Sequence, residues 1–203
     1  MTTSPEKHHD DPWRWLNWSA VLIFAGAVIM IALISAGVFD PKPIGRLQET
    51  LSLGQVNVGA KERRLDWLGQ ETPGTDFSLR LTAALTSGEL DSAYGLAVGD
   101  ETRYLVAAFS PTGYVAFWQQ DGERLDKIIP WRTWPHIRPE FEANELWLDV
   151  ANGQLTAIRT NREILWQGAK SVDGQRIGLW AQTFAAPATF DFQQLEIFAE
   201  PPP

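Results

Sequence analysis

The longest stretch of the chain without a charged residue lies near the N-terminus. From Leu16 to Phe39 there are 24 residues, and none of them is charged. A helix of this length, at 1.5 Å per residue, reaches about 36 Å and exceeds the ~30 Å hydrocarbon layer of a bilayer. The pattern predicts a tail over residues 1–15, a transmembrane helix over 16–39, ended by Asp40-Pro41-Lys42-Pro43, and a linker over 40–46.

Tryptophans gather where this helix is expected to begin. Trp13, Trp15 and Trp18 can bury their rings among lipid chains and keep the indole N–H in the headgroup region. We therefore expect all three at the membrane interface, with lipid as a partner. A cleaved signal peptide is the alternative, because Ser35-Ala36-Gly37 offers small residues that suit a peptidase. Against it, the apolar run is longer than the usual 7–15 residues of such a signal.

Beyond residue 47 the hydrophobic pattern changes to alternation in short runs, broken every 8 to 12 residues by turn residues. This pattern predicts one β-rich domain over 47–203, built as an antiparallel sandwich from consecutive hairpins. The expected strands are Phe77–Leu85, Ala93–Val98, Tyr104–Phe109, Tyr114–Gln119, Arg124–Ile129, Glu145–Ala151, Gln154–Thr160, Glu163–Trp166, Arg176–Thr183 and Thr189–Phe198. The expected turns are Gly99-Asp100, Pro111-Thr112-Gly113, Asp121-Gly122, Asn152-Gly153 and Asp173-Gly174.

Two local patterns near the C-terminus are specific. Asn152-Gly153 between alternating apolar runs is the strongest short-range hairpin signal. The alternation changes parity between Phe192 and Leu195, which predicts a β-bulge.

Three sequence patterns resemble a known type of sandwich. They are Asn-x-Leu-x-Leu-x-Val-x-x-Asn-Gly over 144–153, Gly-x-Arg-Ile-Gly-Leu-Trp-Ala over 174–181 and Phe-x-Phe-x-x-Leu-x-Ile over 190–197. Together they resemble the C-terminal half of concanavalin-like, laminin-G-like domains, and most of all the bacterial 3-keto-disaccharide hydrolase family. The resemblance implies a concanavalin-like jelly roll. It does not imply an activity, because this sandwich carries lectins, hydrolases and adhesion modules alike.

Charge and cysteine content exclude several partners and cofactors. From residue 41 onward the chain has 15 Lys and Arg against 21 Asp and Glu, so its surface repels nucleic acid. With no cysteine, it can form no disulfide, no thiolate metal site and no covalent haem attachment. No phosphate-binding glycine loop or nucleophile elbow is present either, so we predict no cofactor.

Candidate catalytic and metal-binding residues are few. Glu140, Glu142 and Glu145 approach the spacing of a glycosidase carboxylate pair, but they lie before a strand and follow a proline, which favours a solvated loop. We therefore predict a protein that is not an enzyme.

Metal ligands are also sparse. His8 and His9 lie in the tail and His136 stands alone, so no zinc site is predicted. Asp100-Glu101 and Asp121 suit calcium by residue type alone, and solvated turns are the favoured interpretation. No metal is therefore predicted.

One segment has an unusual composition for a loop. Residues 130–139 contain two tryptophans, two arginines, one histidine and three prolines. Indole and guanidinium groups are enriched at interface hot spots, and indole faces also support sugar rings. The predicted partner-binding residues are Trp131, Arg132, Trp134, His136 and Arg138. The alternative is that Trp131 and Trp134 close one end of the core.

These observations predict a single-pass protein of the cell membrane with a non-catalytic β-sandwich. The main hypothesis is an accessory subunit that binds the other subunits of a larger membrane complex, for which an energy-transducing assembly is one candidate. A surface carbohydrate-binding module or a degenerate glycoside hydrolase, with a glycan as partner, is the alternative. The charges on the two sides of the helix nearly balance, so the expectation of a cytoplasmic N-terminus and an extracytoplasmic domain rests on the domain type.

Overall fold

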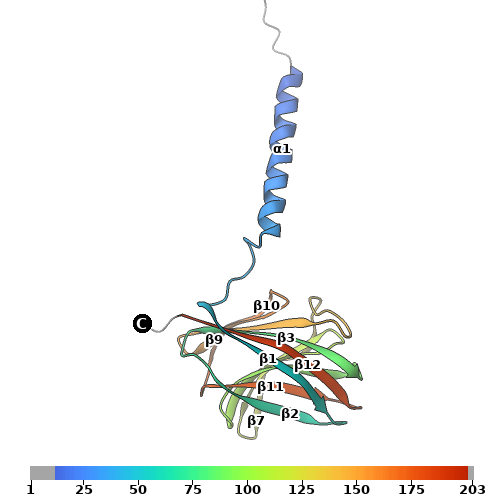
Figure 1. Cartoon of the computed structure of the whole chain (residues 1–203), viewed down its shortest axis with the longest axis vertical. Coiled ribbons are helices and arrows are strands. Elements are labelled where there is room, and N and C mark those ends of the chain that lie inside the picture. The colour runs from blue at the N-terminus through green and yellow to red at the C-terminus, as the bar shows by residue number, and fades with distance from the viewer. Residues whose placement is uncertain (1–11, 201–203) are drawn as a thin grey trace, which may run out of the picture. The chain divides into compact units, whose positions relative to one another are not determined.

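The computed structural model describes residues 12–200, which divide between Pro41 and Lys42 into two compact units. The first unit contains helix α1 (Pro12–Ser35), and the second contains the β-domain (Figure 1). Within the described residues, α1 is the one helix long and apolar enough to cross a membrane, a property that signal sequences share. Trp18 is exposed, as a lipid-facing residue would be. The side chains of Trp13 and Trp15, and the residues His8 and His9, lie outside the described part.

The helix ends earlier than the sequence pattern predicted. Gly37 adopts a left-handed conformation with φ of 67°, and its N–H donates to the Ile34 carbonyl at 3.0 Å. The Val38 N–H donates to the Leu33 carbonyl at 3.1 Å, which completes a Schellman motif. The glycine therefore ends the helix, and the prediction that Asp40 and the prolines after it would do so was wrong.

The β-domain is a sandwich of two antiparallel sheets, which confirms the predicted fold class. Over residues 12–200, sheet A has the strand order β1-β12-β3-β8-β9-β10 and sheet B has the order β2-β11-β4-β5-β6-β7. Figure 1 shows β1, β12 and β3 side by side in one layer. The strands are β1 (Arg46–Val58), β2 (Arg63–Glu71), β3 (Phe77–Gly88), β4 (Ser92–Gly99), β5 (Arg103–Phe109), β6 (Tyr114–Asp121), β7 (Arg124–Thr133), β8 (Asn144–Ala151), β9 (Gln154–Thr160), β10 (Glu163–Ser171), β11 (Arg176–Thr183) and β12 (Ala188–Ala199).

The strand pairing differs from a simple series of hairpins. Neighbours in sequence pair from β4 to β7 and from β8 to β10, as predicted. However, β3 lies between β12 and β8, and β11 lies between β2 and β4. The turn at Asp173-Gly174 therefore crosses between the sheets and does not form a hairpin. Strands β1 and β2 were not predicted, and both are edge strands with a single partner and many polar residues.

Both specific local predictions are confirmed. Asn152 and Gly153 have φ values of 53° and 69°, and two central residues with positive φ are the requirement of a type I′ turn. The register of β12 against β3 shifts between Phe192 and Gln194, which is the bulge that the change of parity predicted.

The connections divide the sandwich into two ends. The chain enters β1 at one end, here called the tether end, where the Ile44 N–H donates to Ser78 Oγ at 2.8 Å. The β2–β3, β4–β5, β6–β7, β8–β9 and β10–β11 connections also lie there. The β1–β2, β3–β4, β5–β6, β7–β8 and β11–β12 connections lie at the opposite, far end. Most of the long loop between β7 and β8 is thus remote from the point where the tether joins.

Candidate functional site

The outer face of sheet B is lined by small residues on its two central strands. The main core of the domain is formed by side chains from both sheets. In β4 the large residues Tyr94, Leu96 and Val98 face this main core, so the alternate positions face outward. Those outward positions, together with their neighbours on β5, β6 and β11, form a second apolar cluster. This outer cluster consists of Ala93, Ala97, Val106, Ala108, Ala116, Trp118 and Trp180.

Two indoles lie across these small residues. Trp180 comes from β11 and Trp118 from β6, and the two strands β4 and β5 lie between them in the sheet. Three strand spacings amount to about 14 Å, yet the ring centroids are 4.9 Å apart with an interplanar angle of 73°. The rings can meet only because the intervening side chains are so short. Both indoles are buried by this arrangement.

A hollow of about 240 Å³ opens above this pair of indoles, and we call it the inner hollow. Trp131, near the end of edge strand β7, forms one wall. Its ring lies 6.3 Å from that of Trp118 and 6.3 Å from that of Phe184, which comes directly after β11. The remaining walls include Arg63, Leu125, Lys127 and Gln182.

A second hollow of about 380 Å³, the outer hollow, lies on the far-end side of Trp131. Its lining combines Trp131, Tyr114 and Phe184 with the polar residues Asp91, Ser110 and Thr112. The three aromatic side chains keep 38%, 42% and 36% of their surface exposed, respectively. Trp131 and Phe184 line both hollows, so the Trp131 indole is a ledge between the inner and the outer hollow.

The inner hollow carries two cations that are not neutralised. Arg63 on β2 and Lys127 on β7 come from opposite edge strands of sheet B, and no ion pair or hydrogen bond of their side chains occurs within residues 12–200. Among the described residues, no acidic side chain lines this hollow. By contrast, the side chains of Arg64, Arg80, Arg103, Arg159 and Arg176 all pair with carboxylates. The inner hollow is thus a positive site in an acidic protein.

The structure does not bring the five predicted partner-binding residues onto one surface. Trp131 faces the outer side of sheet B, whereas Arg132 reaches the other way and donates to the Leu165 carbonyl at 3.5 Å. The Arg132 guanidinium lies 5.6 Å from the ring centroid of Trp134, whose indole packs partly buried against the main core. His136 lies beside Trp134, with ring centroids 5.4 Å apart.

Arg138 is held at the far end by its neighbours in the β7–β8 loop. Its guanidinium donates to the Ala143 carbonyl at 3.2 Å, and its N–H donates to Asn144 Oδ1 at 2.7 Å. Trp131 therefore belongs to the hollows, and the other four residues form a separate cluster at the far end. For Trp134, the partly buried indole agrees with the core-closing alternative.

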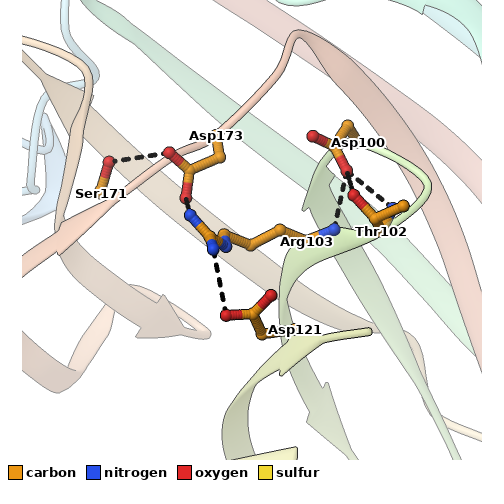
Figure 2. Close-up of polar contacts among 6 residues, drawn as sticks. All are labelled: Asp100, Thr102, Arg103, Asp121, Ser171 and Asp173. Atoms are coloured by element: carbon orange, nitrogen blue, oxygen red, sulfur yellow. Dashed lines mark hydrogen bonds and ion pairs between the residues drawn. The ribbon is translucent and has the colours of Figure 1, made fainter. Parts of the chain in front are cut away.

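Acidic side chains at the tether end are paired with an arginine and with backbone groups (Figure 2). Arg103 lies between Asp121 at 3.1 Å and Asp173 at 3.4 Å. Asp100 Oδ1 accepts hydrogen bonds from the Arg103 N–H and from the N–H and hydroxyl of Thr102, and these bonds lower the pKa of Asp100. Within residues 12–200 no group of three or more His, Asp or Glu side chains could hold a metal ion. These carboxylates therefore link the β4–β5, β6–β7 and β10–β11 connections to one another through hydrogen bonds and ion pairs.

The three glutamates near residue 142 also have structural surroundings. Glu140 and Glu142 lie in the β7–β8 loop, and Glu140 has a φ of 58°. Glu145 is the second residue of β8, where it accepts a hydrogen bond from the Trp147 indole and lies 4.0 Å from Arg80. Only one of the three is thus on a strand.

Most of the inner hollow was not predicted from the sequence. Arg63, Lys127, Phe184, Trp118 and Trp180 come from four strands and one connection that are distant in sequence. One signal was present, namely the alternation of Ala93, Gly95 and Ala97 with large residues in β4, since small residues facing outward leave room above a sheet.

Comparison with known proteins places the fold. No protein-family model matches the chain, and no curated protein matches it in sequence. Among solved structures, it is similar to the carbohydrate binding module CBM66 from Bacillus subtilis, with 15% identity and a TM-score of 0.56 over 76% of this chain and 98% of that chain. The β-domain of this chain therefore has the fold of a concanavalin-like sandwich.

Two further solved structures are similar to parts of this chain. The GH43 BlXynB protein from Bacillus licheniformis is 9% identical, with a TM-score of 0.52 over 71% of this chain, but only 32% of that protein is covered. Galectin LEC-6 from Caenorhabditis elegans is 14% identical, with a TM-score of 0.47 over 73% of this chain and 94% of that chain. At such identities the likeness extends to the fold and not to the ligand.

Proposed function

We propose that this protein is a membrane-anchored, non-catalytic carbohydrate-binding module. The observation that carries the proposal is the exposed indole of Trp131, which stands between two hollows and next to polar side chains. An indole face packs against the C–H groups of a sugar ring, while neighbouring polar groups bond its hydroxyls. CBM66, which has the same fold, is a carbohydrate binding module by name, so the fold is compatible with a ligand of this class.

The non-catalytic part of the proposal rests on the surroundings of the acidic residues. Glycoside hydrolysis needs two carboxyl groups that face the same bond, at about 5 Å or 6.5–9.5 Å from each other. Of the described side chains, none that lines the inner hollow is a carboxylate, and Asp91 is the acidic one in the outer hollow. The hollows therefore offer groups for binding, without a pair of groups for acid and base catalysis. The sequence also resembles laminin-G-like domains and 3-keto-disaccharide hydrolases. From that resemblance the proposal takes the affinity for sugars and not the hydrolytic activity.

The anchoring part of the proposal rests on helix α1. Ten residues separate the end of α1 from the start of β1, so the sandwich stays close to the bilayer if the helix is retained. The outer hollow lies at the far end of the sandwich, away from the point where the tether joins β1. Washing membranes with alkaline carbonate should leave the intact protein in the pellet, and release of a species that begins near Val38 would overturn the anchor.

An array of immobilised neutral and acidic oligosaccharides tests the ligand class. The full-length protein in detergent should bind a defined subset, and Trp131→Ala should lose that binding by about tenfold or more, as loss of a central aromatic contact does. Phe141→Ala is the matched control, because Phe141 is also an exposed aromatic residue but lies outside the hollows. No binding to any saccharide would refute the proposal.

An accessory subunit of a larger membrane complex, such as an energy-transducing assembly, is the second candidate function. The far-end residues Arg132, His136 and Arg138 favour it, because exposed cationic and imidazole groups beside the prolines of this segment suit a protein interface. Purification in mild detergent separates the two functions. A stoichiometric set of partner subunits that is lost in Arg138→Ala, with Arg124→Ala as control, would support this candidate, and a lone protein would contradict it.

A further inference from the structure

The charge of the inner hollow specifies its ligand beyond the general class of carbohydrates. Arg63 and Lys127 stand on opposite sides of the hollow, above an apolar floor formed by Trp118, Trp180 and Ala116. Both residues are exposed, so an anion can reach the two cations from solvent and form charge-assisted hydrogen bonds with them beside this floor. A neutral sugar leaves both charges without a partner.

We infer that the inner hollow binds an acidic oligosaccharide, one whose units carry carboxylates, and that Arg63 and Lys127 select it over neutral sugars. This inference rests on the proposed carbohydrate-binding function and names its substrate class. The ring of a hexuronate offers an apolar face to Trp131 and a carboxylate at its rim. An oligosaccharide that lies across the hollow from β2 to β7 can present a carboxylate to each cation.

The size of the hollows agrees with a short stretch of sugar chain. Sites for drug-sized ligands have volumes of about 300–1,000 Å³, and the inner hollow, at about 240 Å³, is smaller. A flexible chain can continue past the ledge of Trp131 into the outer hollow, where the exposed Thr112 has a hydroxyl group that Ser110 Oγ holds at 2.7 Å. Asp91 lines that outer hollow, so the acidic units belong in the inner one.

The net charge of the chain makes the acidic-ligand assignment easier to test. The chain has a formal net charge of −8, so it repels an acidic polymer at long range and gains nothing from non-specific attraction. Binding of an acidic sugar must then come from local contacts with the two cations. It should weaken as the salt concentration rises, because added ions screen these contacts.

Matched pairs of hexuronate oligosaccharides and their methyl esters test the inference, since esterification removes the charge and keeps the ring. Calorimetric titration of the full-length protein in detergent should give affinities for the acid about tenfold or more above those for the ester, as expected for lost charge-assisted hydrogen bonds. Lys127→Gln and Arg63→Gln should each weaken binding of the acid by a much larger factor than binding of the ester. Arg124→Gln, which removes an exposed cation from the same strand outside the hollow, should change neither.

The possible results separate this inference from the function on which it rests. Equal binding of the acid and the ester, or no effect of Lys127→Gln and Arg63→Gln on the acid, would overturn the acidic specificity and leave carbohydrate binding in place. No binding of any acid, ester or neutral oligosaccharide would overturn both. Loss of acid and ester binding together in Lys127→Gln would mean that the lysine shapes the hollow and does not select charge, which also contradicts the inference.

Discussion

The side-chain amide of Asn144 bonds both backbone groups of Arg138. Its Oδ1 accepts from the Arg138 N–H at 2.7 Å, and its Nδ2 donates to the Arg138 carbonyl at 2.9 Å. Asn144 is fully buried, and its Oδ1 accepts a further bond from Asn161 Nδ2 at 2.7 Å. One side chain at the start of β8 therefore fixes the course of the far-end loop, which would otherwise have buried backbone groups without partners.

Replacing this asparagine should destabilise the domain. In Asn144→Ala the backbone groups of Arg138 lose their partners, and the expected cost in free energy of unfolding is about 2–4 kcal/mol, the sum of two or more lost bonds with buried partners. Asn57→Ala, at an exposed asparagine with one side-chain bond, should cost less than about 1 kcal/mol. Urea unfolding of the full-length protein in detergent, followed by tryptophan fluorescence, measures both. Equal values for the two variants would contradict the role of Asn144.

The two tryptophans of residues 130–139 should differ in their effect on stability. Trp134 packs against the main core, so Trp134→Ala should lower the free energy of unfolding by about 2–4 kcal/mol, somewhat less than for a fully buried tryptophan. Trp131 stands at the surface between two hollows, so Trp131→Ala should cost about 1 kcal/mol or less. The same unfolding experiment compares them. If Trp131→Ala is the more destabilising change, Trp131 belongs to the core and the ledge is wrongly assigned.

Breaking a largely buried ion pair on the outer side of sheet A should destabilise the domain more than breaking an exposed ion pair. Asp149 pairs with Arg159 and also accepts from Ser78 Oγ at 2.6 Å. Asp149→Ala leaves the arginine without a partner in a largely buried place and should cost about 3 kcal/mol. Asp121→Ala breaks the exposed pair with Arg103 and should cost far less, because solvent screens that pair. A double replacement of Asp149 by Leu and Arg159 by Met should recover part of the first loss, and a further loss there would contradict this account.

The turn at Asp100 should give the domain a small pH dependence. Hydrogen bonds from the Arg103 N–H, then from Thr102, lower the pKa of Asp100 in the folded protein. Because the folded pKa is the lower one, the stabilisation is complete above the unfolded pKa of about 3.9 and disappears as the pH falls through the folded value. The stability advantage of the wild type over Asp100→Asn should therefore shrink below about pH 4. A carbon-detected NMR titration that places the Asp100 midpoint above that of the unfolded chain would contradict the prediction.

The sequence was sufficient to predict the elements that depend on residues close to them in the chain. The Asn152-Gly153 turn and the bulge after Phe192 could be predicted because each depends on neighbours in the chain. Strands β1 and β2 could not, because edge strands tolerate polar residues on both faces. The end of α1 differs from the prediction because Gly37 adopts positive φ and ends the helix before the chain reaches Asp40 and the prolines.

The candidate site was predictable only in part, for a reason of topology. Trp131 was singled out by its composition and neighbours, but the direction of its side chain depends on β7 extending to Thr133. Arg63 and Trp180 face the same hollow because β2 pairs with β11, two strands that are far apart in the chain. No local pattern specifies such a pairing. The separation of Trp131 from Arg132 and Trp134 likewise results from the alternation of side chains along a strand that was expected to end earlier.

The most direct test of the account is to observe Trp131 while a saccharide binds. In the full-length protein labelled with 5-fluorotryptophan, Trp131→Phe and Trp147→Phe assign one fluorine NMR signal in the hollow and one on sheet A. Addition of a hexuronate oligosaccharide to saturation should shift the Trp131 signal and leave the Trp147 signal in place. A shift of Trp147 with an unchanged Trp131, or no shift of either, would contradict the claim that the ledge between the two hollows is the binding site.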